Sequence, residues 1–185
     1  MARGYFGIGV EGISKPGNMG SLLRTAHAFG ASFTFAVTPF LDTREMHLVD
    51  TSGSENSIPF YTYPDVASLV LPADCCLVGV ELLDEAVDLP SFRHPTRAAY
   101  VLGPEYGALS PSLAARCQFV VKIPTRFCIN VGVAGALVMY DRMVCLGRFA
   151  ERPVRVGAPP KGVAAHGAGT QKVRNRQRNI AKGSA

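Results

Sequence analysis

Three short segments of this chain place Gly, Pro or Asn where an apolar run stops, and they are its best candidates for holding a ligand. They are Asn18–Ala26, Leu102–Gly107, and the pair Ile123–Pro124 and Ile129–Val131. Each is typical of a loop at the end of a strand, because these residue types favour turns. Loops of this kind that converge can bind a small molecule through backbone amides and carbonyls. We therefore expect all three segments to build one site.

Strand and helix patterns alternate along the chain. Continuous apolar runs such as Cys76–Val80 suit strands that are buried on both faces of a parallel sheet. The alternation predicts an α/β fold in which helices cover both faces of that sheet, with ligands bound beyond the carboxyl ends of the strands. The predicted strands are 5–10, 32–38, 75–82, 97–103 and 118–123, and the predicted helices are 17–30, 111–116 and 130–149, with shorter ones near 44–50 and over 65–71.

Charge divides the chain into two parts. Residues 152–185 carry eight Lys or Arg and no Asp or Glu, whereas residues 1–151 carry 11 basic and 14 acidic residues. We therefore expect a domain over 1–150 and a basic, disordered tail over 151–185, since the tail has few large apolar residues. Such a tail favours polyanions such as RNA, or it is a solubilising extension.

Composition excludes several classes of protein. No apolar run approaches the roughly 18 residues needed to cross a bilayer, and the N-terminus lacks a signal-type apolar region, so we expect a cytoplasmic protein without a membrane partner. The five cysteines include no CxxC pair, and the four histidines are scattered, so we expect no metal site. Gly7–Gly12 matches the GxGxxG pattern, but it lies inside a predicted strand and lacks the acid about 20 residues later that dinucleotide binding requires.

The last predicted helix is apolar on nearly every side. Val133, Leu137, Tyr140 and Val144 form one stripe, and small or apolar residues cover much of the rest. A helix of this kind is buried on more than one side. It is either central to the core or part of a homodimer interface, and the low charged fraction of 18% favours the interface.

The three segments resemble, in order and spacing, the three motifs of the SpoU/TrmH family of SPOUT RNA methyltransferases. The first motif corresponds to Pro16–Ala26 followed by Phe29–Gly30, the second to Leu102–Gly107, and the third to Ile123–Pro124 with Ile129–Ala134. The resemblance extends from residue 5 to about 149. It implies an S-adenosylmethionine-dependent homodimer with a C-terminal deep trefoil knot, which methylates ribose 2′-hydroxyls in tRNA or rRNA. The compact chain favours tRNA.

The resemblance also implies roles for particular residues. Arg24 would orient the phosphate beside the target ribose and stabilise the developing alkoxide, and Asn18 would cap its helix. Glu105 would hold Arg24 or Asn130 in place, and Asn130 would cap the last helix. The expected catalytic residues are Arg24, Asn18, Glu105 and Asn130, and the expected cofactor-binding residues are Val80 (or its neighbour Glu81), Gly103, Ile123, Ile129, Cys128 and Gly107.

Two features of the third motif depart from the family pattern. Its loop is short, and Cys128 and Gly132 stand where serines are often found. The alternative is therefore a non-catalytic RNA-binding or assembly protein that retains the methyltransferase fold. An unrelated α/β nucleotide-binding enzyme is a third hypothesis.

Overall fold

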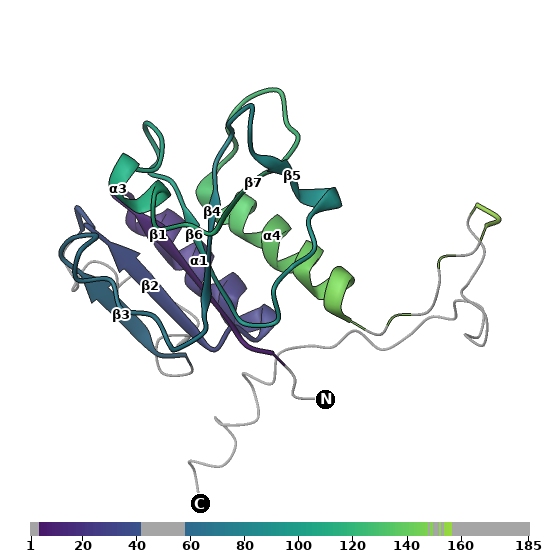
Figure 1. Cartoon of the computed structure of the whole chain (residues 1–185), viewed down its shortest axis with the longest axis horizontal. Helices are drawn as coiled ribbons and strands as arrows, with labels where there is room; N and C mark the ends of the chain where they lie inside the picture. Colours follow the sequence, from purple (N-terminus) through teal and green to yellow (C-terminus); the bar gives the residue numbers. More distant parts are fainter. Residues whose placement is uncertain (1–3, 42–57, 148, 150–151, 153, 157–185) are drawn as a thin grey trace, which may run out of the picture. The chain divides into compact units, whose positions relative to one another are not determined.

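A computed structural model describes residues 4–41, 58–147, 149, 152 and 154–156 (Figure 1). The chain divides after Gly147 into a first unit, 1–147, and a second unit, 148–185. The predicted helix near 44–50 and nearly all of the predicted tail lie outside the described residues. Within the described part, no helix is both long and apolar enough to span a bilayer.

Seven parallel strands form the centre of the first unit, in the order β3-β2-β1-β6-β4-β7-β5. The parallel sheet expected from the continuous apolar runs is confirmed, and β1, β2 and β6 are buried along their whole lengths. The strands are β1 (Phe6–Glu11), β2 (Phe33–Val37), β3 (Phe60–Tyr63), β4 (Cys76–Val80), β5 (Val87–Asp88), β6 (Ala98–Leu102) and β7 (Phe119–Lys122).

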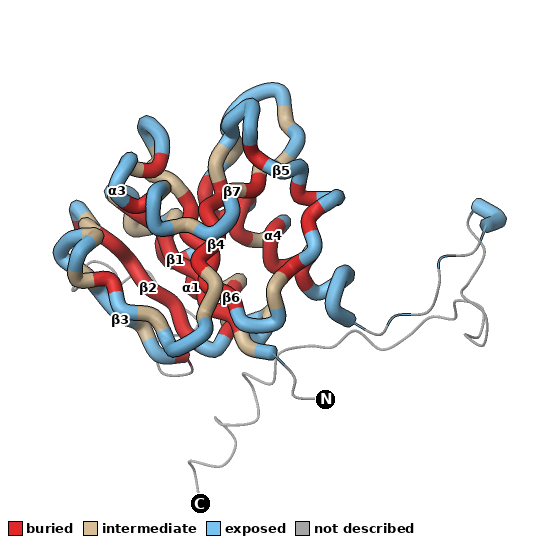
Figure 2. Tube along the Cα trace, viewed as in Figure 1, coloured by how far each residue is buried: buried red, intermediate tan, exposed pale blue. Residues whose placement is uncertain are grey.

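Two separate apolar clusters cover the two faces of the sheet, and the central strands between them are buried (Figure 2). One contains residues of α1 (Pro16–Phe29) and α4 (Val131–Leu146), which pack against each other. The other contains Leu113 of the short helix α3 (Pro111–Ala114) and Leu69. The helix predicted over 65–71 is wrong, because the Asp65 side chain accepts from the Ser68 amide at 2.7 Å and holds a turn instead.

Helix α1 begins earlier than its sequence suggests. Lys15 occupies the N-cap position without a side-chain cap, and Pro16 follows it in the first turn. The predicted N-cap role of Asn18 is therefore wrong, because Asn18 lies inside the first turn and its side chain is free to reach other loops. The helix ends as predicted at Gly30, which adopts the left-handed conformation with φ of 74°.

Helix α4 begins at the cap that the sequence predicts. The Asn130 side-chain oxygen accepts from the amides of Gly132 at 2.9 Å and Val133 at 3.4 Å. A Cβ atom on Gly135 would lie 2.4 Å from Leu22, so a glycine is needed where α4 crosses α1. The predicted stripe points away from the core, since Val133, Leu137 and Tyr140 are 51%, 40% and 49% exposed.

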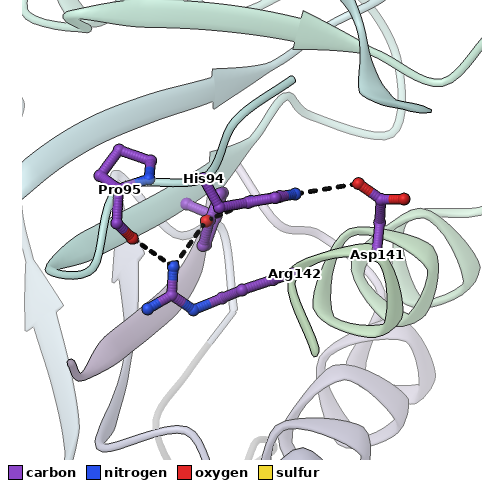
Figure 3. Close-up of polar contacts among 5 residues, drawn as sticks. His94, Pro95, Asp141 and Arg142 are labelled. Carbon is purple, nitrogen blue, oxygen red and sulfur yellow. Dashed lines mark hydrogen bonds and ion pairs between the residues drawn. The ribbon is translucent and has the colours of Figure 1, made fainter. Parts of the chain in front are cut away.

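A buried polar cluster fixes the other end of α4 (Figure 3). Arg142 donates to the hydroxyl of Tyr100 at 3.2 Å and to the carbonyls of Pro95 and Thr96. His94 Nδ1 lies 2.6 Å from the same hydroxyl, and its Nε2 lies 3.0 Å from Asp141. Burial lowers the pKa of His94 and raises the pKa of Tyr100 to about 12. The cluster joins α4 to the segment that leads into β6.

Candidate active site

A cavity of about 340 Å³ opens at the carboxyl ends of β4, β6 and β7, next to the start of α4. This is the edge at which parallel sheets bind ligands. Its wall includes residues from all three segments singled out in the sequence. Every residue expected to bind cofactor lines it, namely Val80, Gly103, Gly107, Ile123, Cys128 and Ile129, and so do Asn18, Glu105 and Asn130.

Asn18 connects the three loops of this wall. Its side-chain NH₂ donates to Oε1 of Glu105, and its side-chain oxygen accepts from the Asn130 NH₂ at 2.8 Å. The other Glu105 oxygen accepts from the Ser14 hydroxyl at 2.6 Å. Glu105 is expected to hold Arg24 or Asn130 in place, and the structure links it to Asn130 through Asn18, which lies between them. One polar network holds the wall together.

Glu81 and Gly103 form a second close contact in the wall. The Glu81 carboxylate accepts from the Leu109 amide at 2.9 Å and from the Leu82 amide at 3.0 Å. A Cβ atom on Gly103 would lie 2.6 Å from Oε2 of this carboxylate. A larger residue than glycine would therefore push the Glu81 carboxylate away from the Leu109 and Leu82 amides. Val80 and Glu81 both line the cavity, as expected.

Two polar residues of the wall were not singled out in the sequence. Thr125 closes the third loop, because its hydroxyl donates to the Phe127 carbonyl at 2.9 Å and its amide donates to the Ile123 carbonyl at 2.7 Å. Lys15 donates to the hydroxyl of Tyr106 at 3.1 Å, and this contact raises the pKa of Lys15. The sequence signal that could have placed Lys15 at the start of α1 is its position directly before Pro16, since Pro is common in the first turn of a helix.

Arg24 is the one predicted site residue that the structure leaves outside the cavity wall. It is exposed on α1, six residues after Asn18. Because successive helical residues turn by about 100°, six residues bring it to a different side of the helix from Asn18. Arg24 could therefore contact RNA only outside the cavity wall.

The wall combines apolar side chains at the strand ends with several oriented polar groups, and oriented polar groups are what fix a ligand in a small-molecule site. Strand-end residues such as Val80 and Ile123 offer backbone groups and apolar side chains, and Glu105 offers a carboxylate. Among the described residues, no group of three or more His, Cys, Asp or Glu could hold a metal ion.

A parallel α/β sheet with a ligand cavity formed by three loops at its carboxyl edge defines a class of small-molecule-binding proteins. Within it, residues 6–140 match the SpoU rRNA Methylase family, and the chain belongs to that family. The resemblance inferred from the three motifs is confirmed.

Curated relatives include proteins that act on different RNAs. The chain is 29% identical over 147 residues to the tRNA (guanosine(18)-2′-O)-methyltransferase TARBP1 of Mus musculus, a match that covers 73% of this chain and 9% of that protein. It is 27% identical over 144 residues to the 23S rRNA (guanosine-2′-O-)-methyltransferase RlmB of Nitrosomonas europaea, which covers 71% and 53%. The chain thus spans about half of RlmB and less than a tenth of TARBP1.

Solved structures share the fold. An rRNA methyltransferase from Sinorhizobium meliloti matches with a TM-score of 0.70 and 23% identity over 79% of this chain and 58% of that one. A structure that concerns 2-OH methylation of C/U34 on tRNA matches with a TM-score of 0.65 and 21% identity, over 78% of this chain and 98% of that one. The predicted α/β fold is confirmed, and the trefoil knot is implied by this likeness.

Proposed function

We propose that this protein is an S-adenosylmethionine-dependent RNA methyltransferase that transfers a methyl group to a ribose 2′-hydroxyl. The observation that carries the proposal is the convergence of the three family motifs on one cavity at the carboxyl edge of the sheet. Family relatives include 2′-O-methyltransferases of tRNA and of rRNA.

The residues of the cavity fit this cofactor. Apolar side chains at the strand ends, Val80 and Ile123, and in the third loop, Ile129, suit a flat adenine ring, and the turns at Gly103 and Gly107 bring backbone groups to the cavity surface. When bound, S-adenosylmethionine supplies an electrophilic methyl group on a sulfonium. A homologous rRNA methyltransferase from Sinorhizobium meliloti was solved with this cofactor bound, at 22% identity and a TM-score of 0.69.

Four polar residues have proposed roles in the reaction. Asn18, Glu105 and Asn130 keep the three loops in register, and the Glu105 carboxylate at the wall can interact with the sulfonium or with the 2′-hydroxyl. Arg24 lies outside the cavity wall, so its proposed role is to orient an RNA phosphate next to the target ribose through its guanidinium. Bringing the hydroxyl and the methyl group into line is the main task of such a site.

We propose tRNA as the substrate and a homodimer as the working form. Of the two solved structures described above, the tRNA-related structure is covered over 98% of its chain, whereas the Sinorhizobium rRNA enzyme is covered over 58% of its chain. The exposed apolar stripe of α4 is the proposed dimer face, and the basic residues of 152–185 are a proposed RNA contact. An RNA substrate and five cysteines without a disulfide suit the cytoplasm.

The experiment measures methyl transfer from tritiated S-adenosylmethionine to total tRNA and to rRNA, followed by nuclease digestion to identify 2′-O-methylated nucleosides. Gly103→Ala should weaken cofactor binding about ten-fold and lower transfer with it, because its Cβ would displace the Glu81 carboxylate from its two backbone amides in the cavity wall. Gly17→Ala is the matched control, since a Cβ there meets nothing within 4 Å. Cofactor binding without transfer to any RNA would favour the non-catalytic alternative, for which the short third loop is the supporting observation.

A further inference from the structure

A second hollow of about 890 Å³ lies beside the cofactor cavity, and Pro104 lines both. Its wall comes from the loops after β1 and β2, from the turn near Asp65, and from the residues around α3. Two aromatic side chains of this wall are strongly exposed, Phe40 at 75% and Tyr106 at 78%. Because so much of each ring is exposed, neither contributes much to the core.

Each ring has identifiable neighbours. The Phe40 amide donates to the Ile13 carbonyl at 2.9 Å, which holds the backbone there, and a Cβ atom on Gly12 would lie 3.5 Å from the Phe40 ring and 3.3 Å from Pro104. The Phe40 ring and Pro104 therefore both lie next to Gly12. Tyr106 is held by Lys15, whose ammonium lies 4.8 Å from the ring centroid and donates to the ring hydroxyl.

The polar groups of the hollow favour a nucleobase over a phosphate. Glu11 accepts from the amide and hydroxyl of Ser110 at 2.7 and 2.5 Å, and Asp65 accepts from the Ser68 amide, which lowers the pKa of Asp65. Both carboxylates line the hollow. Arg116 also lines the hollow, and its guanidinium donates to the carbonyls of Val66 and Leu69. Two carboxylates beside this one guanidinium leave no net positive charge to attract a phosphate, whereas the carboxylates can accept hydrogen bonds from the amino groups of adenine, cytosine or guanine.

We propose that this hollow holds an unpaired base of the RNA substrate, stacked on Phe40 and Tyr106, beside the ribose that reaches the cofactor cavity. The proposal rests on the proposed function, because it adds a base-binding subsite to the same edge of the sheet. Proteins that read RNA stack unpaired bases on exposed aromatic rings, and a duplex offers no such base. The subsite therefore selects loops or single strands over duplexes.

The test uses the full chain and a single-stranded RNA oligonucleotide that carries 2-aminopurine, whose fluorescence falls when the base stacks. Phe40→Ala and Tyr106→Ala should each weaken binding roughly ten-fold and remove the quenching, as expected for one lost stacking contact. Phe40→Tyr and Tyr106→Phe should keep both, because they retain a ring. Tyr61→Ala is the matched control, since Tyr61 is 49% exposed on β3 and does not line the hollow.

Cofactor affinity, measured by calorimetry, should stay unchanged in Phe40→Ala, because Phe40 does not line the cofactor cavity, and thermal unfolding should show that each variant folds. Wild-type affinity and quenching in both alanine variants would overturn the proposal, even if methyl transfer is found. Equal quenching with the duplex form of the oligonucleotide would also overturn it. Quenching that depends on the two rings, in a protein that transfers no methyl group, would refute the proposed function and leave the base subsite standing.

Discussion

Asn18 uses both ends of its side-chain amide to join loops that are far apart in the sequence. Its NH₂ contacts Glu105, 87 residues later, and its oxygen contacts Asn130, 112 residues later. An aspartate could not donate to Glu105, and a shorter side chain would leave a charged carboxylate and an amide without these partners. The geometry of the cavity therefore depends on this one side chain.

Two substitutions on α1 should separate holding the cavity from acting on RNA. Asn18→Ala removes a hydrogen bond to a charged group and a neutral one, so the cofactor dissociation constant should rise about ten-fold and methyl transfer should fall with it. Arg24→Ala should leave cofactor affinity unchanged, because Arg24 does not line the cavity. It should lower methyl transfer at least ten-fold, because the proposed contact with an RNA phosphate is lost. Calorimetry and the tritium assay measure the two effects.

Thr25→Ala is the matched control on the same helix, since the Thr25 hydroxyl only donates to the Ser21 carbonyl within α1 at 2.7 Å. It should change neither quantity. A ten-fold loss of cofactor affinity in Arg24→Ala would contradict the division of roles, as would normal affinity in Asn18→Ala.

At the scale of elements, local patterns predicted five of the seven strands and the two long helices, but they missed β3 and β5 and did not show how side chains link loops. Apolar runs and the terminal Gly30 carry their signal within a few residues, so β4, β6 and the end of α1 could be predicted. The contact of Asn18 with Glu105 has no local signal, because it depends on how loops after different strands meet. The sequence identified both residues only through their motifs.

The end of α4 shows the same limit. Nothing near His94 or Arg142 in the sequence indicates their shared contact with Tyr100, since that contact exists only once α4 lies beside β6. The hydrogen-bond roles are consistent with one another: Arg142 donates to the Tyr100 oxygen, Tyr100 donates to His94 Nδ1, and the His94 Nε2–H donates to Asp141. This series of hydrogen bonds uses His94 in its neutral form, with the proton on Nε2.

Stability should therefore fall as the pH drops below about 6.5, the usual pKa of histidine. Burial lowers the pKa of His94 in the folded protein, with Asp141 opposing the shift, so the unfolded state takes up a proton at a higher pH than the folded state does. Where the unfolded state binds more protons, lowering the pH destabilises the fold. We expect the thermal unfolding temperature to fall between pH 7.5 and 5.5.

His94→Gln removes the titrating group and can still accept from one neighbour and donate to another. Its unfolding temperature should be lower than that of the wild type at pH 7.5, but it should change less over the same pH range. Parallel pH profiles for the two proteins would show that other groups cause the dependence.

At the scale of the whole molecule, charge should govern binding to RNA. Four basic residues occupy every second position from 172 to 178 of the sequence, outside the described residues: Lys172, Arg174, Arg176 and Arg178. Replacing all four by Gln should weaken RNA binding and make the slope of log K against log salt less steep by up to about 3, because each phosphate contact to a single strand contributes about 0.7. Filter binding at several salt concentrations measures the slope.

The matched control replaces Gln171, Asn175, Gln177 and Asn179 by Ser, which changes the same stretch and leaves its charge intact. Its slope should equal that of the wild type. If the charge-reduced variant also keeps the wild-type slope, the basic stretch does not contact RNA and serves as a solubilising extension.

The proposed association through α4 is also tested at the scale of the whole molecule. Its outer stripe includes Leu137 at 40% and Val144 at 37% exposure, and such a stripe on a two-fold axis meets its own copy. Leu137→Lys would place two charges in that interface, so the dissociation constant of the dimer should rise at least ten-fold, since burying one large apolar side chain contributes about 1.5–3 kcal/mol. Sedimentation velocity across a concentration series measures the shift.

Val70→Lys is the matched control, because Val70 is 71% exposed and lies outside α4, so this variant should sediment as the wild type does. Leu137→Lys should keep the wild-type circular dichroism, since the side chain is partly exposed in the single chain. A wild-type protein that sediments as a monomer at every concentration would refute the α4 interface. So would a Leu137→Lys dimer as tight as the wild type, because a stripe buried between two copies could not accept two lysines at no cost in free energy.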